Sequence, residues 1–553
     1  MKVSKVLIVG GVAGGASAAA RLRRLNEDIE IILFEKGEYI SFANCGLPYY
    51  IGGEIKSKAD LTLQTPKGFG RRFKVDVRTF NEVISINKEE KTVEVINHLT
   101  SEKYIESYDL LLLSPGAEPF RPNIEGINLD KVFTLRNIPD TYRIKDYINE
   151  KSPQSAVIIG GGFIGVEMAE NLVTAGLSVT LIEMQNQVMA PFDYDMACLI
   201  HNEMRKNNVS LMLETALEKI EENGSSLKVY TNKGTVDTDM VILAIGVKPE
   251  SSIAKNAGLS VNQRGAIIVD DNMFTSDAHI LAVGDAVEVT DYITKEKVMV
   301  PLAGPANKQG RIAADNIAGI KSEYRGTQGS SILKVFNLTA ACTGINEKTA
   351  KRHNINYEKV FTVPANHASY YPGGQEMYLK LIFNKDTRKV MGAQIVGGDG
   401  VDKRCDVIAA SIHFNATVDD LTKLELCYAP PYSSAKDPVN MAGYVAENVL
   451  NGISRVFHHH DVAALSRDGS VQLIDTRTKG EYMAGHIDGF INIPVDRLRE
   501  HLSELDKNKK VYIVCQVGLR GHVACRILDN HGFESYNLSG GYALYDEIYN
   551  KKK

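Results

Sequence analysis

One of the seven cysteines stands in surroundings that suit sulfur chemistry on sequence grounds alone. Cys515 follows the apolar run VYIV and opens the loop CQVGLR, in which successive backbone N–H groups and Arg520 can surround an anionic sulfur before a helix begins. Such a loop favours a thiolate or a persulfide over the thiol that prevails at neutral pH. Cys525, further along the expected helix, is interpreted as a packing residue.

A second kind of chemistry is indicated by glycines at fixed spacing. Gly160, Gly162 and Gly165 complete a G-x-G-x-x-G motif between the strand-like run SAVII and a helical pattern, so the backbone can approach a pyrophosphate at a helix N-terminus. Glu183, at the end of the next apolar run, can accept the ribose hydroxyls of a dinucleotide. Its charge should repel a 2′-phosphate, which predicts a preference for NADH and leaves NADPH as the alternative.

An earlier glycine turn departs from the strict motif. It consists of Gly10, Gly11, Val12, Ala13, Gly14 and Gly15. Val12 takes the second glycine position, but Glu35, followed by Lys36, ends the next strand-like run as in the later unit. A distant segment, TSDAHILAVGDA, places Gly284 and Asp285 after another apolar run; alone, Asp285 would be interpreted as a turn or cap residue.

Composition restricts the class of protein. The 553 residues are enough for three or more domains, with 44% hydrophobic and 24% charged residues. A net charge of -5 without long basic runs argues against nucleic acid or a membrane surface as partner, and no apolar run is long enough to predict a membrane span. Seven cysteines without CxxC spacing suit a reducing, cytoplasmic compartment.

The order of patterns predicts an α/β protein. We expect two Rossmann-like βαβ domains, an α+β domain and a small C-terminal α/β domain. The expected bounds are 1–149 with 252–325 for a discontinuous first domain, 150–251 for the second, 326–450 for the third, 451–460 for a linker and 461–553 for the last. The histidine triplet in the linker is interpreted as part of that linker, and no metal site is predicted.

Over roughly residues 1–450 the two glycine turns and the late Gly-Asp pair resemble the flavoprotein disulfide reductase superfamily with two dinucleotide sites. The resemblance implies FAD at the first site, NAD(P)H at the second, Asp285 at the flavin ribityl chain, and a homodimer. SFANCGLPYY, with Asn44 and Cys45, lacks the CxxxxC pair of glutathione-reductase-like members. It resembles the single-cysteine branch, which contains coenzyme A disulfide reductases, persulfide reductases, and NADH oxidases and peroxidases. Cys45 is thereby expected to be the redox thiol.

Further residues divide this branch. Oxidases and peroxidases usually carry a histidine where this chain has Ala13. HASYYPGG and CYAPPYSSAKD resemble segments of coenzyme A disulfide reductases whose tyrosines face the redox cysteine of the partner subunit. Tyr370 and Tyr428 match, with Tyr371 and Tyr432 as alternatives. The arginines that could hold the phosphates of coenzyme A, or could be ordinary surface charge, are Arg24, Arg71 and Arg72.

The C-terminal region resembles a rhodanese domain in LIDTRTKGEYMAGHIDGFINIP, VYIVCQVGLRGHVACRIL and GFESYNLSGGY. The resemblance implies that Cys515 and Arg520 are catalytic, whereas the matching Asp475, Arg477 and His486 are expected to organise the fold. The whole chain is thus expected to be an NAD(P)H-dependent reductase of coenzyme A disulfide or persulfide with a sulfur-carrying domain. An NADH oxidase and a sulfurtransferase are the alternatives.

Overall fold

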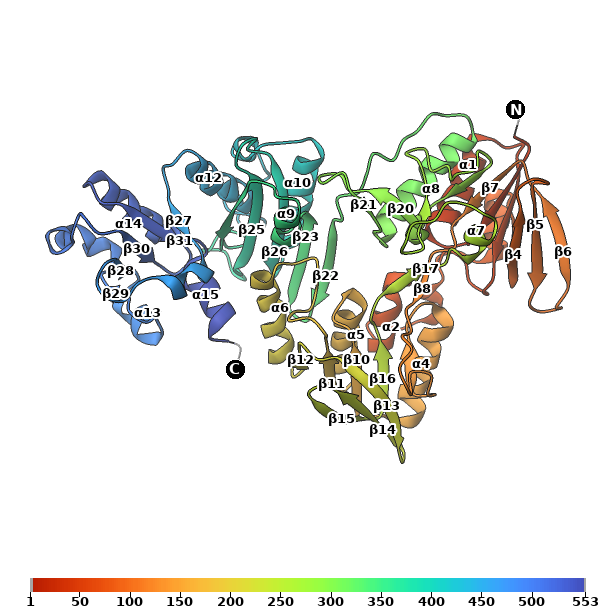
Figure 1. Cartoon of the computed structure of the whole chain (residues 1–553), viewed down its shortest axis with the longest axis horizontal. Helices are drawn as coiled ribbons and strands as arrows, with labels where there is room; N and C mark the ends of the chain where they lie inside the picture. Colours follow the sequence, from red (N-terminus) through yellow and green to blue (C-terminus); the bar gives the residue numbers. More distant parts are fainter. Residues whose placement is uncertain (1–2, 552–553) are drawn as a thin grey trace. The chain divides into compact units, whose positions relative to one another are not determined.

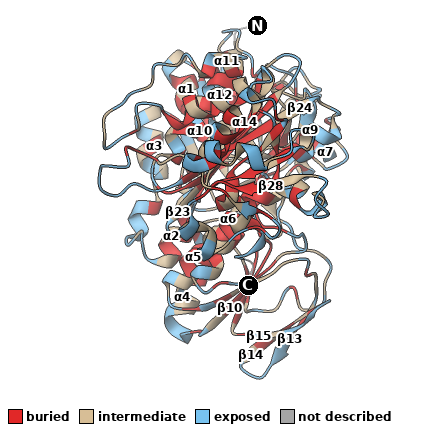
Figure 2. Cartoon of the chain, turned by 90° about the vertical axis from the view of Figure 1, so that its left-hand side faces the viewer, coloured by how far each residue is buried: buried red, intermediate tan, exposed pale blue. Residues whose placement is uncertain are grey.

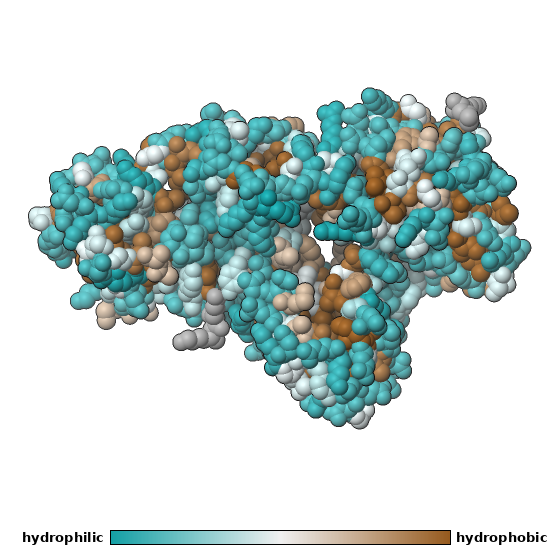
Figure 3. Space-filling view, viewed as in Figure 1, coloured by the Kyte–Doolittle hydropathy of each residue, from teal (hydrophilic) through white to brown (hydrophobic). Residues whose placement is uncertain are grey.

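The computed structural model of the chain describes residues 3–551, which fold into two compact units. Unit 1 contains the chain up to Asn186 and Asn208–Gly329; unit 2 contains Gln187–Asn207 and the chain from Ser330 onward. No helix in the described range is long and apolar enough to cross a membrane. The face drawn in Figure 3 is mainly hydrophilic, with apolar residues in separate patches.

Unit 1 is built on two parallel sheets, each of five strands (Figure 1). Several of their strands are short, nearly continuous apolar runs, as expected where both faces of a sheet are covered. In spatial order the first sheet consists of β19 (Ile280–Ala282), β7 (Leu110–Leu113), β1 (Lys5–Val9), β2 (Glu30–Glu35) and β3 (Asp76–Thr79). The second consists of β12 (Ser210–Met212), β11 (Ser178–Ile182), β10 (Ser155–Ile159), β16 (Met240–Leu243) and β9 (Val132–Thr134).

Helices and small sheets, most of them antiparallel, complete unit 1. The helices are α1 (Ala13–Leu25), α2 (Leu47–Gly52), α3 (Pro66–Phe73), α4 (Ile138–Lys151), α5 (Phe163–Thr174), α7 (Ser252–Asn256) and α8 (Ala303–Ile317). The antiparallel strands are β4 (Asn81–Asn87), β5 (Thr92–Asn97) and β6 (Lys103–Ser107), then β13 (Leu217–Asn223), β14 (Ser226–Thr231) and β15 (Gly234–Thr238). Short pairs join β8 (Ala117–Pro119) to β17 (Val247–Pro249), and β18 (Ile267–Ile268) and β21 (Lys297–Val298) to β20 (Val287–Thr290).

Because β19 pairs with β7, the chain returns to the first sheet after it has built the second. The expected boundary at residue 149 does not match the sheets, however. β9, at Val132–Thr134, pairs with β16 in the second sheet, so the chain has already crossed before α4. A three-residue strand without alternating polarity gives little periodic signal, which explains the difference.

Unit 2 contains an antiparallel sheet and a parallel sheet. The antiparallel order is β22 (Ser331–Val335), β23 (Leu338–Gly344), β26 (Val390–Gly397), β25 (Met377–Asn384) and β24 (Tyr357–Thr362). The helices that accompany this sheet are α6 (Tyr194–Lys206), α9 (Glu347–Arg352), α10 (Val401–His413), α11 (Val418–Leu421) and α12 (Pro438–Leu450). Every residue of β26 is buried, in keeping with its central place in the sheet and the strongly buried strands of Figure 2.

The parallel sheet of unit 2 forms the C-terminal α/β domain. Its order is β27 (Val456–Phe457), β31 (Ser535–Leu538), β30 (Val511–Val514), β28 (Gln472–Asp475) and β29 (Ile491–Asn492). Its helices are α13 (Lys479–Ala484), α14 (Leu519–Asn530) and α15 (Gly541–Tyr549). The expected mixed α/β architecture, with two nucleotide-type domains followed by an α+β and an α/β domain, is confirmed.

The segment 451–460 was expected to be an interdomain linker, but its C-terminal part belongs to the last domain. β27 pairs with β31 as an edge strand of the C-terminal sheet. Before it, Ile453 accepts a hydrogen bond from Arg526 (2.7 Å), and His522 lies within hydrogen-bond distance of Ser454 (3.3 Å). Backbone pairing of this kind cannot be recognised from a polar, histidine-rich sequence.

Candidate active sites

The first glycine turn joins β1 to α1 and is closed by Glu35. Gly10 has φ +97°, and a Cβ there would lie 2.1 Å from the carbonyl oxygen of Ser114, so glycine is required. The Glu35 carboxylate accepts a hydrogen bond from the N–H of Gly11 (2.9 Å). Val12 has a negative φ of -99°, so this position does not need the left-handed conformation that favours glycine. This explains how the turn forms despite its departure from the strict motif.

The second glycine turn repeats this geometry between β10 and α5. Gly160 has φ +107°, and a Cβ would lie 2.4 Å from the Ala244 carbonyl oxygen. Glu183 accepts a hydrogen bond from the N–H of Gly161 (2.7 Å). At Gly162 a Cβ would meet nothing within 4 Å, so packing within the chain does not require glycine there. The space beside the start of α5 fits the close approach of a pyrophosphate.

Asp285 follows β19 in a single 3-10 turn, Gly284–Ala286. Gly284 has φ +86° and donates its N–H to Gln309 Oε1 (2.8 Å), which fixes the turn. Burial raises the pKa of Asp285, with Arg136 acting in the opposite direction. A partly buried carboxylate of this kind suits a hydroxyl-rich ligand, so unit 1 fits a bound dinucleotide. Lys36, another expected nucleotide residue, instead forms an ion pair with Glu250.

Cys45 lies in a 3-10 turn, Asn44–Gly46, directly before α2. Asn44 and Cys45 are both exposed. Removal of water by the surrounding protein raises the pKa of the Cys45 thiol, and the carboxylates of Glu167 and Asp285 raise it further. The thiol is therefore close enough to sense both a residue of the first nucleotide site and a residue of α5, the helix of the second.

The sequence prediction missed Glu167 and Tyr49. The Tyr49 hydroxyl donates to Glu167 Oε1 at 3.4 Å, which connects α2 with α5. Burial raises the pKa of Glu167 to about 7, and Glu170 adds to this, although the bond from Tyr49 opposes it. Perturbed carboxyl groups of this kind are enriched at functional sites. The position of Glu167, inside the helix that opens at the second glycine motif, was the available signal.

The two expected tyrosines of unit 2 meet, although they are far apart in the sequence. The hydroxyl oxygens of Tyr370 and Tyr428 are 3.0 Å apart, and both side chains are exposed. Their hydrogen bond raises the pKa of Tyr370. The alternatives Tyr371 and Tyr432 are also exposed, and Tyr371 packs edge-on against the ring of His367.

A buried arginine connects the two tyrosine-bearing segments. Arg404 is 1% exposed, and its Nη2 donates to the carbonyl oxygens of Asn366 (3.0 Å) and Tyr432 (3.3 Å). The same nitrogen donates to Ser433 Oγ and Asp437 Oδ2, each at 3.0 Å. Arg404 thus holds the start of one segment against the end of the other.

The loop at Cys515 joins β30 to α14. Cys515 is fully buried, and Sγ accepts a hydrogen bond from the N–H of Gly518 at 3.1 Å. Burial raises the pKa of this thiol above its usual value, and the N–H groups of Gly521, Gly518 and Val517 and the charge of Arg520 offset this only in part. Arg520 itself donates to both carboxylate oxygens of Glu481, at 2.8 and 2.5 Å. The sequence prediction of a sulfur-binding loop did not include Glu481.

The other expected residues of this domain lie in structural contacts. Arg477 and Asp475 form a buried ion pair (2.7 Å), and Arg477 also donates to the carbonyl oxygen of Gly485 (2.6 Å). His486 stacks on Tyr482. Cys525 is buried in the apolar core of the domain.

The arginines expected at coenzyme A lie on the surface of unit 1. Arg24 is in the last turn of α1, and Arg71 and Arg72 are in the last turn of α3. All three are exposed, and α1 and α3 contact each other.

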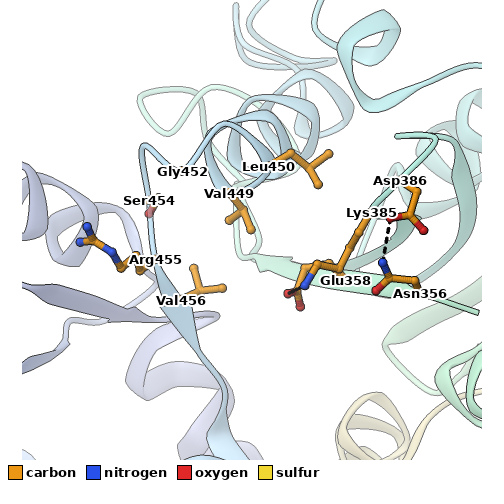
Figure 4. A pocket seen from close by; sticks show the side chains of 10 residues that line it. All are labelled: Asn356, Glu358, Lys385, Asp386, Val449, Leu450, Gly452, Ser454, Arg455 and Val456. Atoms are coloured by element: carbon orange, nitrogen blue, oxygen red, sulfur yellow. Dashed lines mark hydrogen bonds and ion pairs between the residues drawn. The ribbon is translucent and has the colours of Figure 1, made fainter.

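A pocket of about 440 Å³ lies elsewhere in unit 2, between α12, β24 and β27 (Figure 4). Its polar side chains already have partners: Asn356 donates to Asp386 (2.9 Å), Lys385 pairs with Glu358 (3.8 Å), and Arg455 pairs with Asp529 (3.4 Å). No candidate site residue lines it. We therefore interpret it as a gap at a domain junction and not as an active site.

Comparison with known families divides the chain in the same order. Residues 4–310 match the pyridine nucleotide-disulphide oxidoreductase family, residues 330–438 match the dimerisation domain of that family, and residues 458–547 match the rhodanese-like domain. The coenzyme A disulfide reductase of Staphylococcus epidermidis is 39% identical over 446 residues, which are 80% of this chain and 100% of that protein. An NADH oxidase of Methanocaldococcus jannaschii is 37% identical over 451 residues, which are 81% of this chain and 99% of that protein.

Two solved structures match nearly the whole chain. Reduced CoADR-RHD of Bacillus anthracis has a TM-score of 0.96 and 53% identity, and the match covers 99% of this chain and 98% of that one. An NAD-dependent persulfide reductase from A. fulgidus has a TM-score of 0.92 and 37% identity, over 98% and 99% of the two chains. The FAD and pyridine nucleotide expected from the sequence are the cofactors of this family. The chain belongs to the pyridine nucleotide-disulphide oxidoreductase family and carries a C-terminal rhodanese-like domain.

Proposed function

We propose that the chain uses electrons from NADH to reduce coenzyme A disulfide or coenzyme A persulfide at Cys45, while Cys515 carries sulfane sulfur. One observation carries the proposal: Cys45 is exposed and is the one cysteine of unit 1. Unit 1 offers no second cysteine with which Cys45 could form a disulfide, so Cys45 pairs instead with a thiol of the substrate. The named activities of the similar coenzyme A disulfide reductase and persulfide reductase support this assignment.

The nucleotide turns supply the binding groups. In this proposal the turn at Gly10 to Gly15, with Glu35 and Asp285, holds FAD, and the turn at Gly160 to Gly165, with Glu183, holds NADH. Bound FAD supplies a two-electron carrier between the nicotinamide and a disulfide. The carboxylate of Glu183 disfavours the additional phosphate of NADPH.

Cys45 acts as the nucleophile. Its thiolate attacks one sulfur of coenzyme A disulfide, a Cys45–coenzyme A disulfide forms, and one coenzyme A thiolate leaves. With coenzyme A persulfide, attack on the sulfur attached to coenzyme A forms the same mixed disulfide and releases hydrosulfide. Two electrons from NADH then cleave the mixed disulfide. With the uptake of protons, Cys45 is restored as a thiol and coenzyme A is released as a thiol.

Tyr370 and Tyr428 are proposed to serve this step in a homodimer. They form an exposed, hydrogen-bonded pair within the region that matches a dimerisation domain. Their hydroxyls can donate hydrogen bonds to a leaving sulfur at the partner subunit's Cys45. Arg24, Arg71 and Arg72 are proposed to bind the phosphates of coenzyme A. Seven free cysteines suit a reducing compartment, which we propose is the cytoplasm.

Coenzyme A is proposed to carry sulfur from Cys515 to Cys45, so that the C-terminal domain does not have to move to deliver it. Between the end of α12 at Leu450 and the start of β27 at Val456 the chain is short, and several of its residues bond to α14. A segment fixed in this way has little reach. A diffusible carrier removes the need for Cys515 to approach Cys45 directly.

The test is anaerobic NADH consumption by the purified holoenzyme with coenzyme A persulfide, coenzyme A disulfide or no acceptor, with sulfide measured in parallel. We expect acceptor-dependent turnover, and sulfide release with the persulfide. Cys45→Ser should abolish turnover of both acceptors. Cys427→Ser, which removes the other exposed cysteine, should retain it.

Two outcomes would contradict the proposal. Undiminished turnover in Cys45→Ser would remove this thiol from the mechanism. NADH loss that needs only oxygen would favour the oxidase activity for which the Methanocaldococcus relative is named; Ala13, in place of the histidine of such enzymes, argues against it.

A further inference from the structure

We propose that Glu481 is a specificity-determining residue of the Cys515 site, which selects persulfide donors of low charge over dianionic donors such as thiosulfate. The inference rests on the proposed role of Cys515 as a sulfur carrier. It does not depend on Cys45, FAD or NADH, because it concerns only how Cys515 receives sulfur.

The cation whose charge acts on Cys515, Arg520, is neutralised by a partner. Arg520 is near enough to Cys515 for its charge to lower the pKa of the thiol. Both of its Nη nitrogens, however, donate to the carboxylate of Glu481, at 2.8 and 2.5 Å. Paired guanidinium and carboxylate groups present almost no net charge to an incoming anion.

Glu481 cannot easily move away from this position. It is the N3 residue of the capping box of α13, where its carboxylate accepts hydrogen bonds from the N–H (2.9 Å) and the hydroxyl (2.7 Å) of Thr478. Its bond with Arg520, opposed by partial burial, holds the pKa of Glu481 at about 2. It therefore stays ionised at neutral pH, and two helices, α13 and α14, hold the pair together.

The groups that bond directly to the Cys515 sulfur are backbone N–H groups. Backbone N–H groups stabilise one sulfur anion by hydrogen bonds but bring no net charge, and Cys515 is fully buried. A donor with two negative charges that approaches Cys515 must lose water near the paired Arg520 and Glu481, which is unfavourable because the pair offers no net positive charge. An organic persulfide brings at most one charge at its reacting end, and the phosphates of coenzyme A lie at the far end of its pantetheine arm.

The transfer itself is balanced for either donor. The Cys515 thiolate attacks the terminal sulfur of RSSH, the S–S bond breaks, and RS⁻ takes the proton, which leaves Cys515–S–S⁻ and RSH. With thiosulfate the same attack releases sulfite. No oxidant or reductant is needed, so the identity of the donor depends only on binding and on the leaving group.

Glu481→Gln is the matching variant, because glutamine keeps the capping box and the shape of the side chain but removes the charge. Cys515 persulfide formation is followed by peptide mass spectrometry in the full-length holoenzyme without NADH, with thiosulfate or coenzyme A persulfide as donor. We expect kcat/KM for thiosulfate to rise about tenfold and that for coenzyme A persulfide to change by less than about twofold. Glu500→Gln, which breaks an exposed pair with Arg497 in the same domain, should change neither.

A second measurement separates charge from folding. Freeing Arg520 should lower the pH at which Cys515 is alkylated in Glu481→Gln, which a purely structural role of Glu481 would not do. An unchanged ratio of kcat/KM for thiosulfate to kcat/KM for coenzyme A persulfide, or an equal loss of kcat/KM with both donors, would overturn the inference. If Cys515 accepted sulfur from no donor even in the unaltered protein, its proposed role as carrier would fail instead.

Discussion

The side chain of Glu167 contributes, after burial, to the raised pKa of Cys45. Burial raises its pKa to about 7, so the carboxyl changes charge in the neutral range, and its ionised form raises the pKa of the Cys45 thiol. Glu167→Gln removes this charge. At pH 8 we expect Cys45 of the holoenzyme to be alkylated roughly threefold faster in the variant, because more thiolate is present.

The raised pKa of Glu167 should also make the stability of the protein depend on pH. A carboxyl group whose pKa is higher in the folded than in the unfolded protein favours folding at low pH, and this advantage is lost as the pH rises through about 7. The free energy of unfolding of Glu167→Gln should therefore change less between pH 5 and pH 8 than that of the unaltered protein. In the alkylation experiment, Cys427, the second exposed thiol, is the internal control. An equal acceleration of alkylation at Cys45 and Cys427 would contradict the role of Glu167 at Cys45.

Residues within a local motif could be predicted from the sequence, and residues defined by tertiary contacts could not. Glu35 and Glu183 follow from the spacing of a βαβ unit, and each contacts its glycine turn. Glu167 acquires its unusual pKa only through burial beside Tyr49, which no spacing encodes. Glu481 had a local signal, the capping box that begins at Thr478, but its contact with Arg520 joins two helices that are distant in the sequence.

At the scale of elements, Arg404 on α10 holds the two segments that carry Tyr370 and Tyr428. Lysine at this position could keep the pairing with Asp437 but could not reach several acceptors at once. We expect Arg404→Lys to lower the rate at which the disulfide is reduced by about tenfold, while reduction of the flavin by NADH stays within twofold. Stopped-flow measurement of the two half-reactions separates these steps.

Arg388→Lys is the matched control, because Arg388 pairs with Asp419 in the same domain but contacts neither tyrosine segment. It should leave both half-reactions unchanged. A parallel loss of both half-reactions in Arg404→Lys would indicate general damage to the fold and would contradict a positioning role.

Element boundaries show the same limit of sequence patterns. The strands that centre the parallel sheets, such as β1, β10 and β30, are clear apolar runs and were predicted. β9 and β27 have three and two residues, and each becomes a strand only because a longer neighbour pairs with it. Such edges depend on tertiary context, so the expected boundaries at 149 and 451–460 were displaced.

At the scale of the molecule, a buried ionic cluster connects segments that lie far apart in the chain. Lys380 on β25 is fully buried and contacts Asp193 (3.0 Å), Asp195 (2.8 Å) and Glu347 (2.6 Å). Asp195 is also 3.4 Å from His459, which comes just after β27. The cluster thereby attaches α6, whose sequence interrupts unit 1, to the sheet of unit 2.

The charges in this cluster depend on one another. Burial alone would raise the pKa of Glu347, but Lys380 and Lys359 outweigh burial and hold it at about 2. Burial alone would likewise raise the pKa of Asp195, but Lys380 outweighs burial, so the pKa of Asp195 is lowered. Carboxyl groups with lowered pKa values stabilise the fold above about pH 4.5, and this contribution is lost as the pH falls towards 2.

Lys380→Met would leave Asp193 and Asp195 buried without this cation, whereas Glu347 would keep its contact with Lys359 (2.7 Å). At pH 7 we expect the variant to lose about 3 kcal/mol or more of local stability, measured as hydrogen exchange of the α6 amides. The loss should be smaller at pH 5, because carboxylates without a cation regain raised pKa values and can take up protons. Lys385→Met removes a partly exposed pair with Glu358 and should cost less than about 1 kcal/mol. Equal protection of α6 in the two variants would show that Lys380 does not attach this helix, and the segment Gln187–Asn207 would then be held to unit 2 by apolar packing.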